Sequence, residues 1–474
     1  MTDVLLINPP TPQKGRYIIR DLNRSGRTSK ERIIWPQTSL AYLAAMLPKK
    51  ISVKIVDCIA EDMDWEKLEA IIGKEKPKLV GAHVITSTAH NDLKTFGIVK
   101  RLNKKTKTVT FGPHSTELVS ETFSECEGLD YIIRGEPELT FEALVKHAFG
   151  EKISLSSVDG LAYRAGGKIR INKDRKFIKD LDSLPLPRHD LLPIKKYLFP
   201  FMSEGFTFVV GSRGCPFPCT FCRQPIMWKG QIRSRSPESL IEEMKLLRRL
   251  GIKEFLFSTD TFTVDKQIVM KFCELMIREG LNDIRWACNS RVDTIDREMA
   301  EAMKKAGCWM MALGLESGSN KILKLAKKGT TVKQNKEIVK MLDDVGIKIY
   351  GYFIIGLLGE TKKTIRQTIE LAKELPVTFA IFHVASPYPG TVFYKQVKER
   401  GFLTDEGWEA SDQGNMSPVD YPDLSGSEII AGIRRAYREF YLRPIAVWRI
   451  LTSVRNFGDL GHLVSAGLSQ LFWR

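Results

Sequence analysis

The sequence predicts an α/β protein with two parallel-sheet units in series, followed by a helical C-terminal region. Short apolar segments such as residues 4–7 and 131–133 are hydrophobic at every position, which is typical of strands buried on both faces. Helical segments such as residues 91–102 separate them, and the same alternation begins again after about residue 198. The 474 residues are 43% hydrophobic, which suits two or three domains with ordinary cores.

The first region, residues 1–150, has the pattern of a Rossmann-like parallel sheet. Its expected strands cover residues 4–7, 51–56, 79–84, 108–111 and 131–133, and helices are expected between them. Ligands bind at the carboxyl ends of strands in such sheets. These ends are rich in Gly, Pro, Ser, Thr and His, so a ligand site is predicted along this edge.

A linker with a small hairpin, residues 151–197, is expected before the second unit. Residues 198–425 then predict six βα units, with strands at 207–210, 254–258, 284–288, 309–313, 348–355 and 378–384. Six such units in series predict a partial (β/α)6 barrel related to the eight-unit TIM barrel. Residues 426–474 are expected to be helical.

Composition narrows the class of protein. The N-terminus lacks the basic segment and cleavage site of a signal peptide, and no apolar run reaches the roughly 18 residues of a membrane span, so a cytoplasmic location is expected. The net charge of +16 is spread along the chain. It is compatible with a solvated basic surface, an anionic membrane, a nucleic acid or an acidic substrate.

Three of the eight cysteines lie within eight residues, as Cys215-Pro-Phe-Pro-Cys219-Thr-Phe-Cys222 directly after the first expected barrel strand. The other five cysteines are scattered and are expected to be small core residues. Three thiolates on one loop can hold three irons of a [4Fe-4S] cubane, which leaves the fourth iron without a protein ligand. Structural zinc normally needs four protein ligands, and no fourth ligand lies nearby in the sequence.

This Cys-x3-Cys-x2-Cys motif resembles that of the radical SAM superfamily. The resemblance implies that Cys215, Cys219 and Cys222 are the catalytic and metal-binding residues. It also implies that the open iron chelates the amino and carboxylate groups of S-adenosylmethionine, and that one electron from the cluster releases a 5′-deoxyadenosyl radical. Phe221 matches the family's aromatic position beside the adenine.

Later strand ends match the family's S-adenosylmethionine contacts in order and spacing. The resemblance assigns polar groups at Thr259 and Asp260 to the amino group, Arg291 to the carboxylate, and Glu316 to the ribose or methionine end. The backbone from Ile354 to Gly356 would face the adenine.

The first region resembles the cobalamin-binding domain that precedes this barrel in class B radical SAM methyltransferases. The resemblance predicts cobalamin contacts at Thr86, Ser87, Gly112, His114 and Gly135. The usual Asp-x-His-x-x-Gly loop, whose histidine ligates cobalt, is absent, and the second strand is followed by Asp57-Cys58-Ile59-Ala60. Either cobalt has no protein histidine beneath it, or the domain has kept the fold without the cofactor.

The leading functional hypothesis is cobalamin-dependent methylation of an unactivated carbon. Members resembling this chain also include ring-forming or rearranging enzymes of tetrapyrrole and hopanoid metabolism that transfer no methyl group. A tRNA methylthiotransferase is disfavoured because Cys58 and Cys126 are isolated and no RNA-binding module is evident. A corrinoid or redox sensor is the non-enzymatic alternative.

The C-terminal region combines arginines with aromatic residues, including Trp448, Phe472 and Trp473. Its apolar face could pack on the barrel or lie on a membrane surface. The expected partners are a small or lipid-like substrate and a reductant such as flavodoxin or ferredoxin, with possible peripheral membrane contact and no nucleic acid.

Overall fold

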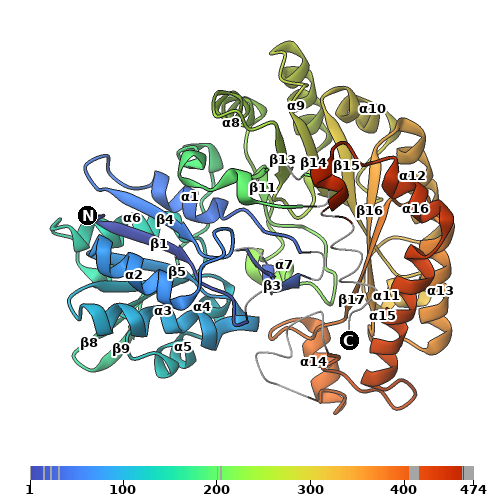
Figure 1. Ribbon diagram of the computed structural model, residues 1–474. Helices are drawn as coiled ribbons and strands as arrows, with labels where there is room; N and C mark the ends of the chain where they lie inside the picture. Colours follow the sequence, from blue (N-terminus) through green and yellow to red (C-terminus); the bar gives the residue numbers. More distant parts are fainter. Residues whose placement is uncertain are drawn as a thin grey trace. The chain divides into compact units, whose positions relative to one another are not determined.

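The computed structural model divides the chain into two units, Met1–Leu198 and Phe199–Arg474. The structure describes residues 2–13, 17–21, 24–29, 32–199, 201, 202, 205–404, 416–461 and 463. Each unit is built around its own sheet, and the α/β class with two parallel-sheet units is confirmed (Figure 1).

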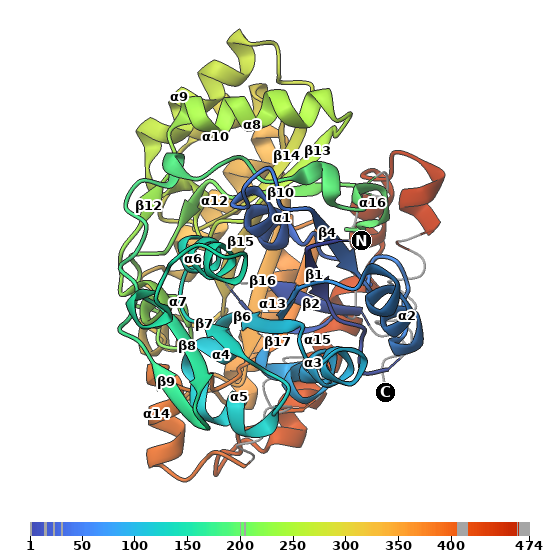
Figure 2. The same ribbon diagram turned by 90° about the vertical axis from the view of Figure 1, so that its left-hand side faces the viewer.

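The first unit contains a seven-stranded sheet in the order β4-β1-β5-β6-β7-β8-β9 (Figure 2). Its first five strands are parallel, which confirms the Rossmann-like sheet: β4 (Val53–Asp57), β1 (Val4–Asn8), β5 (Leu79–His83), β6 (Lys107–Phe111) and β7 (Tyr131–Ile133). The strand order reverses between β1 and β5, and open α/β sheets bind ligands at such a switch point.

Helices cover the two faces of this sheet. Val80, Ala82 and Val84 pack with Phe96 and Phe123 in one apolar core cluster. That face carries α2 (Trp65–Glu75), α3 (Ala89–Leu102) and α5 (Val119–Glu125). The pair α1 (Thr38–Ala45) and α6 (Glu138–Ala148) contact each other, and α1 lies against β1 and β4. Because side chains alternate along a strand, His83 points away from the Val80 cluster.

Residues 151–197 do more than connect the units. The hairpin of β8 (Leu161–Ala165) and β9 (Lys168–Ile171) exists as expected, but it adds two antiparallel strands to the sheet, next to β7. Downstream, Ile178, Leu181 and Leu184 form a small core cluster with Met46 and Leu139 packed against it. The segment therefore belongs to the first unit, because its apolar side chains are buried there.

A second hairpin, β2 (Tyr17–Asp21) with β3 (Arg24–Ser29), was not expected from the sequence. It lies beside two elements that follow sheet strands: η1 (Thr86–Thr88) and α4 (Pro113–Glu117). The segment has no clear apolar pattern, so its position is decided by tertiary contacts.

The second unit contains six parallel strands in chain order, which confirms the partial barrel. They are β10 (Thr207–Val209), β13 (Glu254–Phe257), β14 (Arg285–Ser290), β15 (Cys308–Glu316), β16 (Lys348–Ile355) and β17 (Phe379–Val384). The strands β14 and β15 run two and three residues further than expected, to Ser290 and Glu316. The predicted site residue Glu316 is therefore part of a paired strand, opposite Phe353 of β16.

A ring of helices surrounds this sheet (Figure 1). Successive helices pack on one another: α8 (Pro237–Arg249), α9 (Lys266–Arg278), α10 (Arg297–Lys305) and α12 (Val332–Val345). The next helix, α13 (Lys362–Glu374), packs against α15 (Gly426–Tyr441). This arrangement leaves β17 as a sheet edge.

The edge of β17 is covered by α15. The hydroxyl of Tyr437 accepts a hydrogen bond from the Phe382 amide at 3.3 Å, and the hydroxyl of Tyr441 bonds both the amide and the carbonyl of Ala380 at 3.2 and 2.9 Å. Unpaired backbone groups at a sheet edge invite association, and these tyrosines satisfy several of them.

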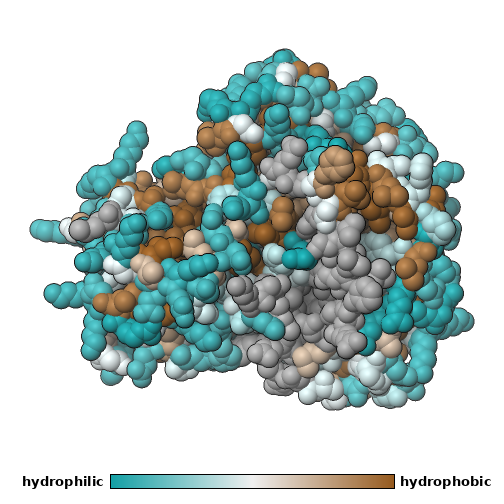
Figure 3. Space-filling view, viewed as in Figure 1, coloured by the Kyte–Doolittle hydropathy of each residue, from teal (hydrophilic) through white to brown (hydrophobic). Residues whose placement is uncertain are grey.

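The helix α16 (Pro444–Leu451) turns its basic side toward the rest of the second unit. Its arginine Arg449 pairs with Asp343 of α12 at 2.8 Å, and Arg455, just beyond the helix, pairs with Glu254 of β13. The apolar side chains face solvent instead, with Trp448 64% exposed, and Figure 3 shows a hydrophobic patch over α16. Of the two alternatives for this region, packing of the apolar face on the barrel holds for α15, whose residues Ile433 and Phe440 are buried, whereas α16 exposes its apolar residues because ion pairs fix its basic side inward.

Phe472 and Trp473 lie outside the described residues. Among the helices that the structure describes, none combines the length and the hydropathy of a membrane span.

Candidate functional site

The cysteine loop follows the short strand β11 (Ser212–Arg213), which pairs with β12 (Arg233–Ser234). Gly214 begins the loop at φ +96°, where an added Cβ would lie 2.0 Å from the Gln231 carbonyl oxygen. Only glycine fits such a backbone approach. The loop is also held from its middle, because the Thr220 amide donates to the Ala326 carbonyl at 3.0 Å.

The three predicted cluster cysteines lie together on this loop. Cys215 and Cys219 are buried and Cys222 is half-buried. Desolvation raises the pKa of all three thiols, so their thiolate forms require nearby positive charge. Among the described residues, no three His, Cys, Asp or Glu side chains converge on a single-ion site. A cubane places each sulfur on a different iron, so this donor set fits a [4Fe-4S] cluster.

Arg291, directly after β14, binds other side chains of this unit. Its guanidinium pairs with Asp293 through Nε and Nη2, at 2.9 and 2.8 Å, and its Nη1 lies 3.6 Å from the Cys219 sulfur. The guanidinium carbon stands 3.6 Å from the centroid of the Phe217 ring. Arg291 is thus directed to the cysteine loop, and its role at the cofactor carboxylate stays a prediction.

A buried ion pair joins Glu316 to Lys328, with Oε1 and Nζ 2.7 Å apart. Glu316 ends β15 at φ +59°, a strained backbone conformation for a residue other than glycine. A Cβ on Gly314 would lie 2.4 Å from the Glu316 carboxylate and 2.6 Å from the Lys328 ammonium, so the charged ends of this pair pack closely against the glycine. Lys328 was missed by sequence reasoning because it lies in a segment with several lysines and no spacing distinguishes it.

The end of β13 carries the next predicted contacts. Thr259 is buried, its carbonyl accepts from the Asn289 side chain at 3.0 Å, and its hydroxyl has no hydrogen-bond partner among the described residues. Asp260 is half-buried, and its charge acts on Cys215 and Cys222. An unpaired buried hydroxyl beside the cysteine loop fits a polar ligand.

The end of β16 is held by two side chains that sequence reasoning did not assign. Glu360 is buried and accepts from the Gly356 amide at 2.6 Å, and Tyr421 donates to the Gly356 carbonyl at 2.8 Å. Burial raises the pKa of Glu360 to about 7. Ile354, two residues before Gly356, is half-buried, and so is Phe221 on the cysteine loop.

In the first unit, a buried polar network lies at the carboxyl ends of the strands. Arg20 pairs with Asp92 at 2.6 Å with both side chains fully buried, and it donates to Asn8 at 3.0 Å. Asn8 in turn donates to Asp57 at 2.7 Å, and Tyr197 donates to the other Asp57 oxygen at 3.0 Å. The charged side chains of Arg20, Asp57 and Asp92 are therefore bonded to other residues of the first unit and contribute to its stability.

The predicted cobalamin contacts lie along the same edge. Thr86 and Ser87 belong to η1, Gly112 lies between β6 and α4, and His114 is in the first turn of α4. The Gly135 amide donates to Thr116 of α4 at 3.1 Å, which places Gly135 beside that helix.

His83, at the end of β5, was not predicted. It is fully buried and stacks on Phe111 with ring centroids 5.7 Å apart. Neither ring nitrogen has a partner among the described residues, and desolvation, followed by the charge of Arg20, lowers its pKa to about 3. The ring occupies the space that Gly112 leaves, because a Cβ there would lie 2.9 Å from the ring.

These features fit a corrinoid that is held by shape more than by ligation. The Ser87 hydroxyl is also buried without a partner among the described residues, and Gly112 adopts φ +121°, which side chains disfavour. Unpaired buried groups beside a glycine at a topological switch point suit a ligand that approaches the backbone closely.

Comparison with known proteins decides the family. The family model described as Radical SAM superfamily matches residues 209–372, and the B12 binding domain matches residues 30–145. An uncharacterised methyltransferase of Pyrococcus horikoshii is 36% identical over 445 residues, covering 93% of each chain. The chain belongs to the radical SAM superfamily. It is an enzyme of the group that carries a B12-binding domain, and its cofactors are a [4Fe-4S] cluster, S-adenosylmethionine and cobalamin.

Two further proteins, one compared by sequence and one by structure, are similar to this chain over most of its length. The anaerobic magnesium-protoporphyrin IX monomethyl ester cyclase of Cereibacter sphaeroides is 28% identical over 93% of this chain and 73% of its own length. The methyltransferase TsrM of Kitasatospora setae, solved with cobalamin and a [4Fe-4S] cluster, superposes with a TM-score of 0.69 at 17% identity, over 93% of this chain and 82% of that one. That similarity shows a shared fold.

Proposed function

We propose that this enzyme methylates an unactivated carbon of a small, largely apolar substrate. The observation that carries the proposal is the presence in one chain of a three-cysteine barrel site and a corrinoid-type sheet edge, together with a named methyltransferase similar over nearly the whole length. When bound, the cluster supplies the electron that cleaves S-adenosylmethionine, and cobalamin supplies a methyl carrier.

The chain's own residues would divide the work at the barrel mouth. Cys215, Cys219 and Cys222 would hold the cluster, with Arg291 beside the Cys219 sulfur. The Glu316–Lys328 pair would offer one group of each sign to the amino and carboxylate ends of S-adenosylmethionine. Opposite charges that already pair in a buried site can exchange partners with a zwitterion without leaving a charge unpaired.

Other strand ends would complete the S-adenosylmethionine site. Thr259 and Asp260 would contact its methionine end, and Phe221 with the backbone from Ile354 to Gly356 would enclose the adenine. In the first unit, Thr86, Ser87, Gly112, His114 and Gly135 would line the cobalamin site, with His83 beneath Gly112.

We propose that the successive regions of the chain have different functions. Residues 1–150 would form the cobalamin-binding domain, with residues 151–197 packed on it as they lead to the second unit, residues 198–425 would form the catalytic barrel, and residues 426–474 a helical C-terminal region.

An isotope experiment tests the proposal. The anaerobically reconstituted enzyme would receive S-adenosylmethionine with a deuterated methyl group, a reductant, and a metabolite extract from cells lacking the gene. One labelled methyl group in a product for each 5′-deoxyadenosine is the expected result. Substrate-dependent 5′-deoxyadenosine without any labelled product would contradict methylation. The Cys219→Ala variant is the matched control.

A second candidate function is radical ring formation without methyl transfer. It is favoured by the similarity to the cyclases, which extends over 93% of this chain. In the same experiment it predicts a product with altered hydrogen content and no label. Absence of 5′-deoxyadenosine under all conditions would favour a sensor.

The partners follow from the chemistry. The enzyme needs a small-molecule substrate and a reductant, and we propose flavodoxin or ferredoxin for the latter.

The exposed patch on α16 supports peripheral membrane contact: Ile445, Trp448 and Leu451 are 52%, 64% and 51% exposed. Apolar helix faces with tryptophan suit a membrane interface. Sedimentation with anionic vesicles that is lost in Trp448→Glu is expected, and equal sedimentation of both proteins would contradict it.

A further inference from the structure

A segment rich in lysine and free of acidic residues lies between Glu316 and Glu337. Its six lysines are Lys321, Lys324, Lys327, Lys328, Lys333 and Lys336. The short helix α11 (Asn320–Leu325) forms its first part, and α12 begins in its last part. The cofactor contacts proposed above use only Lys328, so they do not explain this concentration of positive charge.

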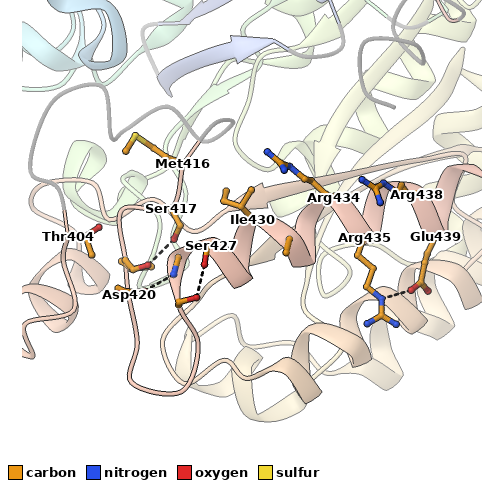
Figure 4. Close-up of a pocket in the computed structure, with 14 residues that line it drawn as sticks. Thr404, Met416, Ser417, Asp420, Ser427, Ile430, Arg434, Arg435, Arg438 and Glu439 are labelled. Atoms are coloured by element: carbon orange, nitrogen blue, oxygen red, sulfur yellow. Dashed lines mark hydrogen bonds and ion pairs between the residues drawn. The ribbon is translucent and has the colours of Figure 1, made fainter. Parts of the chain in front are cut away.

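Three of these lysines have carboxylate partners. The ion pairs are Lys328–Glu316 at 2.7 Å, Lys336–Glu374 at 2.7 Å and Lys333–Glu337 at 3.8 Å. The side chains of Lys321, Lys324 and Lys327 are exposed and form no ion pair or hydrogen bond with the described residues. We name these three the α11 lysines. On α15, by contrast, Arg435 is bound to Glu439 at 2.6 Å (Figure 4). The α11 lysines therefore add net positive charge to this part of the surface.

The segment after α11 lies directly beside the cysteine loop. The Ala326 carbonyl accepts a hydrogen bond from the Thr220 amide at 3.0 Å, and Thr220 follows Cys219 in the chain. Lys327 follows Ala326 and is exposed. A single hydrogen bond thus connects the residue next to a proposed cluster ligand with the residue next to an exposed lysine. Because electrons transfer faster over shorter distances, a donor bound at this surface is well placed to reduce a cluster on the loop.

The end of α11 holds Lys327 in this position. The Lys328 amide donates to the Leu323 carbonyl at 3.0 Å, and the Lys327 amide donates to the Lys324 carbonyl at 3.1 Å. This is the Schellman pattern, in which glycine usually occupies the left-handed position. Here Lys327 occupies it, at φ +50°. The chain therefore keeps a charged side chain at a place where glycine would cost less backbone strain.

An apolar side chain lies among these charges. Leu325 is 44% exposed, and it follows Lys321 by one helical turn, so the two share a face of α11. Lys321 and Lys324 also lie one turn apart, where like charges repel each other until an anionic partner neutralises them. A small apolar centre with a charged rim is typical of protein interfaces, and weak redox complexes bury less than roughly 1,200 Å².

We propose that the α11 lysines and Leu325 form the docking surface for a small acidic one-electron carrier protein. Carboxylates of the carrier pair with the lysines, and an apolar side chain of the carrier packs on Leu325. One electron passes from the reduced carrier to the oxidised cluster, so the carrier loses one electron, the cluster gains one, and no atom is transferred. The inference rests on the proposed function, because this electron is the one that cleaves S-adenosylmethionine.

Calorimetric titration of the cluster-loaded, full-length chain tests the surface. The probes are a flavodoxin and a [2Fe-2S] ferredoxin, titrated separately at low and at high salt. At least one carrier is expected to bind, more weakly at high salt because salt screens the charges. The carrier that binds shows whether the donor is a flavoprotein or an iron–sulfur protein. Absence of binding by both carriers would overturn the proposal.

A charge reversal locates the surface. Lys321→Glu combined with Lys324→Glu is expected to weaken binding at low salt by at least about tenfold, because electrostatic steering is reversed. The matched control combines Lys253→Glu with Lys305→Glu, which are exposed and directly precede or lie just before β13 and β15. This is the opposite end of the parallel strands from the cysteine loop, so binding should stay within about twofold. Equal affinities of the two double variants would overturn the proposal.

A milder variant tests the residue nearest the loop. Lys327→Asn removes the charge and keeps a residue type that tolerates this backbone conformation. Stopped-flow absorbance should show slower cluster reduction by the carrier and an unchanged rate with dithionite. Equal slowing with both reductants would overturn a docking role for Lys327. Circular dichroism checks that the variants remain folded.

Nucleic acid is the competing occupant of a lysine-rich surface. Bulk tRNA that binds more tightly than either carrier, and loses its affinity in the Lys321→Glu and Lys324→Glu double variant, would overturn the proposal. Methyl-label transfer with dithionite as the reductant needs no carrier protein. A failure of the docking surface and a failure of the methylation proposal therefore give different results.

Discussion

The two parallel sheets of this chain present their ligand-binding ends in different ways. At the strand ends of the barrel unit, the groups that we propose as cofactor contacts are side chains of specific type: three thiols, Arg291 beside Cys219, and the Glu316–Lys328 pair. At the edge of the first sheet, the charged groups Arg20 and Asp92 form an ion pair with each other. The residues that we propose as cobalamin contacts there are small or neutral.

The difference follows from how each cofactor is held. An iron–sulfur cluster is bound by covalent ligands, and only cysteine at fixed spacing supplies them here. A corrinoid without a protein ligand to cobalt has to be held by shape and by scattered hydrogen bonds, and we propose that Gly112 is one place where it approaches the backbone. Such contacts can be made by many residue types, so they leave a weak signal in the sequence.

The largest expected effect concerns the barrel site. Cys219→Ala should reduce bound iron from about four atoms per chain to near zero, because the cubane loses one of three ligands. Iron analysis and chromatography of 5′-deoxyadenosine measure the result. Cys126→Ala removes a buried cysteine of the first unit and should retain both properties. Normal cleavage in Cys219→Ala would refute the assignment of the cluster.

The next effect tests whether the first sheet edge is structural. Arg20→Met leaves Asp92 buried without its partner and should lower the free energy of unfolding by about 3–5 kcal/mol, while iron content is unchanged. Urea unfolding monitors it. The exposed pair Arg101–Glu69, on the same unit, provides the control, since Arg101→Gln should cost less than about 1 kcal/mol. Equal losses in both variants would contradict this prediction.

At the barrel mouth, the corresponding change should affect both stability and ligand binding. Lys328→Met leaves Glu316 unpaired and should cost about 3 kcal/mol of unfolding free energy. It should also weaken S-adenosylmethionine binding, measured by equilibrium dialysis on the cluster-loaded protein. Lys245→Met, at an exposed ion pair, should change neither quantity. If Lys328→Met destabilises the chain with unaltered S-adenosylmethionine affinity, Lys328 is only structural.

Glu360 should give the barrel unit a pH-dependent stability. Its pKa is raised by burial from the ordinary 4.5 to about 7 in the folded chain, so the folded state holds a proton that the unfolded state releases between these values. Stability should therefore fall as pH rises through this window, by up to about 3 kcal/mol. Glu360→Gln keeps a neutral acceptor and should flatten the profile. If the stabilities of the two proteins change with pH in the same way between pH 4.5 and 7.5, the pH dependence does not come from Glu360.

The smallest effect tests the hydrogen bonds to cobalamin. Ser87→Ala removes one hydroxyl with no partner among the described residues and should weaken cobalamin retention several-fold, about 1 kcal/mol. Absorbance after gel filtration with hydroxocobalamin measures the retained corrinoid. Ser124→Ala, on the exposed side of α5, is the control. Identical retention in both variants would remove Ser87 from the site.

Sequence reasoning located the regular elements well where apolar patterns were strong. The strand expected at residues 348–355 coincides with β16 (Lys348–Ile355). The hairpin β2–β3 was missed, because it is anchored by Arg20, whose partners Asn8 and Asp92 lie in other elements. The ends of β14 and β15 were placed too early, since polar residues there continue the strand pairing.

The amino-acid order alone predicted the two sheets, which the structure confirms, and it named three cysteines as the cluster ligands, because a cysteine motif and apolar periodicity are local properties. Tertiary structure decided which polar groups meet. Lys328 pairs with Glu316, Arg20 with Asp92, and α16 turns its apolar side outward, because each depends on how distant elements pack and which partner neutralises a buried charge. Such pairings follow from spatial proximity, which local sequence patterns do not encode.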